Sequence, residues 1–106
     1  MPVYVFGVIE VADMAAYAKY QEGARRALAP FRGRFRVLAS GGDAVVYEGE
    51  RLANHMFVFE FESRQVWEEF YHSAAYRDVI QVRLDNAATK TLVLMEGKGG
   101  RVNPVA

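Results

Sequence analysis

Two side chains in the C-terminal half of the sequence are suited to acid–base and anion chemistry. His72 lies at the end of a helical pattern, and it is our first candidate for a general base because imidazole titrates near neutral pH. Arg83 could clamp a carboxylate or phenolate, since guanidinium offers a bidentate fork. Each has a simpler explanation: contact with the helix C-terminal carbonyls for His72, and a structural salt bridge for Arg83.

Several tyrosines at helical spacing could line a pocket and present hydroxyl groups to a small ligand. The candidates are Tyr17, Tyr20, Tyr71 and Tyr76. Aromatic residues at this spacing more often belong to a hydrophobic core, and Trp67 has the same pattern. The sequence therefore leaves both a ligand-binding and a packing role open for them.

Two carboxylates, Glu10 and Glu60, each end the apolar side of a predicted strand. A carboxylate in an apolar site can have a raised pKa, so the two could form an acid–base pair. The corresponding ends of antiparallel neighbours lie at opposite edges, however. We therefore expect these residues to lie apart, at exposed strand ends.

Motifs for metal or cofactor binding are absent. His55 and His72 lack the spacing that places two ligands on one helix face, and we expect His55 on the surface because it lies in a polar loop. The pair Gly41-Gly42 reads as a turn, without the glycine pattern of a phosphate-binding loop. With no cysteine, the chain has no disulfide or thiolate nucleophile. We expect no metal and no cofactor.

Charge and composition favour an ordinary globular protein. Of 106 residues, 52% are hydrophobic and 25% are charged, with 13 basic residues balancing 13 acidic ones. A net charge of zero argues against nucleic acid or an anionic membrane as the main partner. No apolar run has the length of a membrane span, and the first strand leaves no room for a leader, so we expect a cytoplasmic protein.

Hydrophobic periodicity predicts alternating strands and helices. Asp13 and Ser63 are expected to cap the first two helices, and a further short helix is expected to contain Tyr76 and Leu84. The predicted strands span residues 3–11, 34–39, 56–61 and 90–96, with a short strand-like piece at 44–48. We expect one domain over residues 1–97 and a flexible C-terminal tail over residues 98–106.

This element order predicts an α+β, ferredoxin-like βαββαβ fold with a four-stranded antiparallel sheet. The first and third main strands would be central, with Arg34 and Arg36 on an edge strand. Both central strands are apolar on both faces, and helices can cover only one of them. A partner subunit or an apolar ligand must cover the other, which favours a homodimer formed through sheet faces, with a cavity between sheet and helices.

A series of short motifs identifies a related family. In order along the chain these motifs are Tyr4, Val11-x-Asp13, Tyr17 with Tyr20, Gly33-Arg34-Phe35-x-Val37, Gly41-Gly42, Glu48-Gly49, Phe61-x-Ser63, Phe70-Tyr71-x-Ser73, Tyr76, Arg83, Ala87-Ala88 and Glu96-Gly97. The chain resembles bacterial domain of unknown function family 1330, in the dimeric α/β-barrel superfamily. It departs from the family pattern at Glu62, often proline, and at Ser40, often arginine. The resemblance implies the fold and a homodimer but no reaction.

Two functions follow from these expectations. In the first, the dimer binds a small aromatic or carboxylate-bearing metabolite between sheet and helices. Superfamily relatives include cofactor-independent monooxygenases and muconolactone-type isomerases, so an enzyme here would use His72 as base and Arg83 as anion clamp, without a cofactor. In the second, the protein is a non-catalytic ligand-sensing or stress-response dimer. The sequence does not choose between them.

Overall fold

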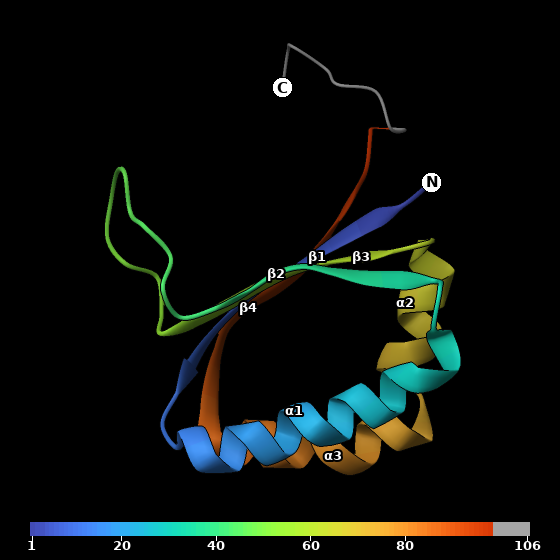
Figure 1. Ribbon diagram of the computed structural model, residues 1–106, viewed down its shortest axis with the longest axis horizontal. Helices are drawn as coiled ribbons and strands as arrows, with labels where there is room; N and C mark the ends of the chain where they lie inside the picture. The colour runs from blue at the N-terminus through green and yellow to red at the C-terminus, as the bar shows by residue number, and fades with distance from the viewer. Residues whose placement is uncertain (99–106) are drawn as a thin grey trace.

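The computed structural model describes residues 1–98, which form one sheet with helices on one of its faces (Figure 1). In chain order the elements are β1 (Val3–Val11), α1 (Met14–Leu28), the 3-10 turn η1 (Ala29–Phe31), β2 (Phe35–Gly41), β3 (His55–Phe61), α2 (Arg64–Tyr71), α3 (Ala74–Asn86) and β4 (Ala87–Glu96). No helix in this part of the chain is long and apolar enough to cross a membrane.

The sheet has four antiparallel strands in the order β2-β3-β1-β4. This confirms the predicted α+β, ferredoxin-like fold with the first and third main strands at its centre. Arg36 lies on the edge strand β2 and forms an ion pair with Glu60 at 2.6 Å. Arg34, the residue before β2, forms an ion pair with Glu62 at 3.1 Å. Charged side chains at such an edge discourage pairing with other chains.

The prediction of a short strand-like piece at residues 44–48 is wrong. The whole segment between β2 and β3 is irregular, and Val45 and Tyr47 in it are 76% and 93% exposed. These residues have strand-forming side chains but no neighbouring strand to pair with, and a strand requires one.

Other element boundaries also differ from the prediction. Strand β2 continues to Gly41, β4 begins at Ala87, and α3 has 13 residues instead of forming a short helix. Of the tail predicted at residues 98–106, all but the first residue lies outside the described residues.

The face of the sheet that contacts the helices holds the main core. Val5 lies opposite Phe59 in the register, and Val3 lies opposite Phe61. Val3, Val5 and Phe61 are at most 1% exposed and pack with Val66 of α2. Burying each such side chain contributes about 1.5–3 kcal/mol. This packing fixes the distance between sheet and helices, and so the space left between them.

The opposite face of the sheet has no helix over it (Figure 1). Because side chains alternate along a strand, Phe6, Val58 and Val93 lie together on this face, in the register that joins β3, β1 and β4. Val93 and Met95 of β4 are 42% and 68% exposed. We call this surface the open face.

Candidate functional site

A cavity of about 260 Å³ lies between α1 and the β2–β3 half of the sheet. Its walls are largely aromatic, with Phe35 of β2 and Phe57 and Phe59 of β3 on the sheet side. The rings of Phe57 and Phe59 are 4.8 Å apart and tilted against each other. An aromatic wall of this kind favours a flat apolar ligand.

Helix α1 contributes two tyrosines to the cavity. Its N-cap Asp13 accepts a hydrogen bond from the Ala16 amide at 3.1 Å, which fixes where the helix begins. Tyr17 and Tyr20 are three residues apart on one face of this helix, and their ring centroids are 5.3 Å apart. Both line the cavity.

Tyr76 reaches the same cavity from the first turn of α3. The Ser73 hydroxyl accepts from the Tyr76 amide at 3.2 Å and donates to the Phe70 carbonyl at 2.7 Å, so it joins α2 to α3. The hydroxyl oxygens of Tyr76 and Tyr20 are 2.6 Å apart, a short hydrogen bond. The three cavity tyrosines therefore come from two helices that meet above the sheet.

Tyr17 and Tyr20 keep their protons at neutral pH. Burial raises the pKa of Tyr17 to about 12. Burial, followed by the neighbouring Tyr76, also raises the pKa of Tyr20 well above its usual value. A protonated phenol can donate a hydrogen bond, either to a neighbouring side chain or to a ligand oxygen.

His55 is buried at the cavity wall, so the prediction of a surface position was wrong. It is 9% exposed, and its ring centroid is 5.1 Å from that of Tyr17. The Asn54 side chain binds both backbone groups of Val11, at 2.8 and 2.9 Å, and so anchors the chain just before His55. Burial lowers the pKa of His55, which favours the neutral imidazole at pH 7.

Arg83 is buried behind the tyrosines and does not itself line the cavity. It is 4% exposed, and its guanidinium carbon lies 5.6 Å from the Tyr20 ring centroid. Its Nη1 donates to Thr89 Oγ1 at 2.5 Å, whereas its Nε has no hydrogen-bond partner. Burial opposes its charge, but the neighbouring Tyr76 and Tyr20 outweigh this effect and raise the pKa of Arg83. It is cationic at every relevant pH.

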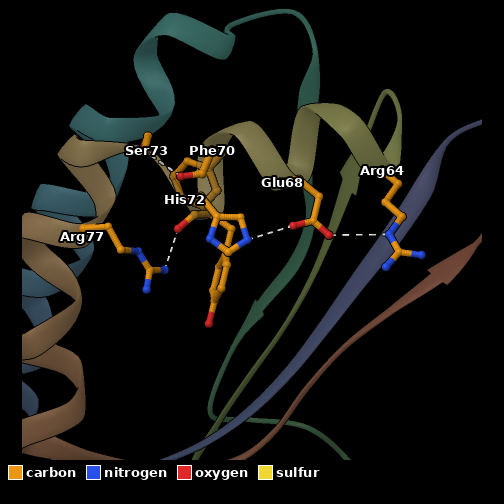
Figure 2. A network of polar contacts seen from close by, with 7 residues as sticks. Arg64, Glu68, Phe70, His72, Ser73 and Arg77 are labelled. Carbon is orange, nitrogen blue, oxygen red and sulfur yellow. Dashed lines mark hydrogen bonds and ion pairs between the residues drawn. The ribbon is translucent and has the colours of Figure 1, made fainter.

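The other residues singled out from the sequence lie elsewhere. His72 is at the C-terminal end of α2, where its Nε2 is 3.0 Å from Glu68, which in turn pairs with Arg64 (Figure 2). Its side chain is 65% exposed. Tyr71 stacks on Trp67 at 5.2 Å and is not among the cavity-lining residues. Neither His72 nor Tyr71 therefore lines the cavity, although the Tyr71 ring centroid lies 5.8 Å from that of Tyr76.

The two glutamates lie apart, as expected from the antiparallel register. Glu60 lies opposite Tyr4, near the other end of β1 from Glu10. Its carboxylate accepts from Arg36 at 2.6 Å and from the Tyr4 hydroxyl at 3.1 Å. The Arg36 hydrogen bond holds the pKa of Glu60 below its usual value. Glu60 is therefore an ionised member of a polar cluster on the open face.

The cavity combines apolar walls with donors and one neutral imidazole. Within residues 1–98, no group of three or more His, Asp or Glu side chains is placed to hold a metal ion. The cavity residues missed at the sequence level include His55, Arg25, Phe57 and Phe59. His55 could have been found, because it continues the alternation of Phe57, Phe59 and Phe61 on the helix-facing side.

Several solved structures share this fold. A protein of unknown function from Rhodopseudomonas palustris has a TM-score of 0.73 at 16% identity, covering 91% of this chain and 82% of its own. A dimeric ferredoxin-like protein of unknown function from Jannaschia sp. CCS1 has a TM-score of 0.67 at 14% identity, covering 92% and 100%. SnoaB, a cofactor-independent oxygenase from Streptomyces nogalater, has a TM-score of 0.60 at 10% identity, covering 97% of each chain. At these identities the likeness shows the fold alone.

Membership of a family rests on the sequence match. No functionally curated protein is significantly similar to this chain. The family model described as "Domain of unknown function (DUF1330)" matches residues 2–98, which include every helix and strand given above. The chain therefore belongs to the DUF1330 family, as its sequence motifs indicated.

Proposed function

We propose that this protein is a homodimer in which each protomer binds a small aromatic metabolite in the cavity between sheet and helices. The observation that carries the proposal is the aromatic cavity with Tyr17, Tyr20, Tyr76 and His55 on its wall. A dry cavity of about 150 Å³ can hold benzene. The 260 Å³ found here therefore suits a ligand of one or two rings with a polar substituent.

Catalysis in this cavity would be acid–base chemistry without a cofactor, such as oxygenation or isomerisation. A solved structure of the same fold is that of a cofactor-independent oxygenase, which makes such a reaction worth testing. His55 is better placed than His72 to accept a proton from a bound phenol, because only His55 lines the cavity. The position of His72 outside the cavity favours binding as the first function to establish, with a non-catalytic sensor as the alternative.

The open face supports the homodimer. Phe6, Val58, Val93 and Met95 present apolar surface there, and burying a large apolar side chain contributes about 1.5–3 kcal/mol. An exposed apolar patch of this kind is typical of a protein–protein interface. A second copy of the same face would bury it symmetrically. The dimeric neighbour from Jannaschia has the same fold.

Ligand binding can be tested with a substitution at the mouth of the cavity. Val37 lines the cavity from the edge strand and is 53% exposed, so Val37→Trp should place an indole in the entrance without disturbing the core. Leu38→Trp is the matched control, because Leu38 is 46% exposed and does not line the cavity.

The probe is 2-naphthol, and isothermal titration calorimetry measures its binding. We expect one site per protomer in the wild type and the Leu38→Trp variant, and at least a tenfold loss of affinity in Val37→Trp. Equal affinity in all three proteins, or no binding to the wild type, would contradict the proposed cavity.

The dimer can be tested with a charge on the open face. Val58→Lys places an ammonium group at the centre of the apolar surface, where burial without a partner is costly. We expect sedimentation velocity to show a dimer for the wild type and a folded monomer for Val58→Lys. Met14→Lys, on α1 and 56% exposed, should remain dimeric. A monomeric wild type at micromolar concentration would refute the dimer.

A further inference from the structure

Arg83 and the hydrogen-bonded pair Tyr20–Tyr76 together indicate the charge of the ligand, provided that the proposed binding function holds. The Arg83 guanidinium has only donors and cannot accept a hydrogen bond. Its guanidinium carbon lies 5.6 Å from the Tyr20 ring centroid, and the Tyr20 hydroxyl shares a hydrogen bond with that of Tyr76. Neither tyrosine can therefore donate a hydrogen bond to Arg83.

The Tyr20–Tyr76 pair then has one proton left over. Two hydroxyl groups carry two protons, and the 2.6 Å hydrogen bond between them uses one. The second proton cannot be donated to Arg83, which has no acceptor. Both tyrosines line the cavity, so the free O–H is available to a ligand oxygen there. The cavity thus offers a donor, supported from behind by a cation.

The charged residues around the cavity also favour an anionic ligand. Arg25 lines its wall from α1, and neither aspartate nor glutamate is among the lining residues. Within residues 1–98, no carboxylate lies within ion-pair distance of Arg83, whose Nε is buried without a partner. Burying a cation without an anion is costly, because its hydration is lost. A bound anion would offset this cost.

We infer that the ligand is an aromatic anion, with its rings between the phenylalanines and its carboxylate or phenolate oxygen accepting a hydrogen bond from the Tyr20–Tyr76 pair. Arg83 acts as a positioning residue that keeps this pair oriented as a donor toward the cavity. Inorganic anions do not fit, since most of the wall is apolar. A neutral aromatic compound would fill the same space but leave the Arg83 charge unbalanced.

The test compares two probes of nearly identical shape, 2-naphthoate and the neutral 2-naphthamide, by calorimetry at pH 7. A hydrogen bond to a charged group typically gives a tenfold to hundredfold difference in affinity. We expect the wild type to prefer naphthoate by at least about tenfold. Tyr20→Phe and Arg83→Met should reduce this preference to within about threefold while still binding naphthamide.

Tyr71→Phe is the matched control, because it removes a tyrosine hydroxyl outside the cavity, and it should keep the wild-type preference. Arg83→Lys, which retains the charge, should keep part of it. Equal binding of both probes by the wild type would overturn this inference and leave the proposed binding function intact. Failure of both probes to bind would overturn both. A preference that survives in Tyr20→Phe and Arg83→Met would also refute the inference.

Discussion

Replacing Gly7 by alanine tests how the cavity wall is built. Gly7 lies opposite Phe57 in the register, and the Phe57 ring lies across it. A Cβ atom at residue 7 would lie 2.1, 2.4 and 2.7 Å from three ring carbons of Phe57. Non-bonded carbons are normally about 3.5–4.0 Å apart. The ring must therefore move by more than about 1 Å, and the cavity lies beside it.

The expected cost follows from two opposing effects. Overpacking a core costs about 1–3 kcal/mol, whereas alanine is favoured over glycine within a strand by about 0.5–1 kcal/mol. We therefore expect Gly7→Ala to lower the free energy of unfolding by about 1–2 kcal/mol in the wild-type background. It should also weaken 2-naphthol binding, because the displaced Phe57 ring is part of the cavity wall.

A double-mutant cycle isolates this contact. Phe57→Leu removes the ring carbons that conflict with an added Cβ, so in this background Gly7→Ala should be neutral or stabilising by up to about 1 kcal/mol. Urea unfolding of the four proteins, followed by circular dichroism, measures the coupling, which we expect to be about 1.5–3 kcal/mol. An equal effect of Gly7→Ala in both backgrounds would show that the ring does not cross Gly7.

Two further predictions follow from the cavity wall and the helix start. Burial lowers the pKa of His55 in the folded protein, so the unfolded chain binds a proton at His55 more readily, and the stability contributed by neutral His55 should be lost as pH falls below about 6.5. Urea unfolding at pH 7.5 and 5.5 should show a larger decrease in the free energy of unfolding for the wild type than for His55→Gln. Equal decreases would contradict this prediction. Ser63 caps α2 by accepting a hydrogen bond from the Val66 amide. Ser63→Ala should therefore lower the free energy of unfolding by about 1 kcal/mol in the same urea assay. An unchanged value would show that the cap contributes nothing to stability.

The fold could be predicted because hydrophobic periodicity is a local property. The alternation in β1 and β3 and the caps Asp13 and Ser63 each depend on a few neighbouring residues. The same local rule failed at Val45 and Tyr47, since a strand also needs a partner that the local sequence does not supply.

The cavity could be predicted only in part. Tyr17, Tyr20 and Tyr76 were identified because aromatic residues at helical spacing share a face. The ring of Phe57 over Gly7 depends on the register between strands 50 residues apart, which periodicity does not determine. The burial of Arg83 beside the Tyr20 ring depends on how α1 and α3 pack together. Such contacts are set by tertiary packing, which is why the sequence favoured His72 over His55 as a candidate base.

A crystal structure of the wild-type protein with 2-naphthoate tests directly whether the cavity binds an aromatic anion. We expect one ligand in the cavity of each protomer, with its rings against Phe57 and Phe59 and a carboxylate oxygen about 2.6–3.0 Å from the Tyr20 or Tyr76 hydroxyl. A ligand bound outside the cavity, or one with its carboxylate turned away from these tyrosines, would contradict this expectation.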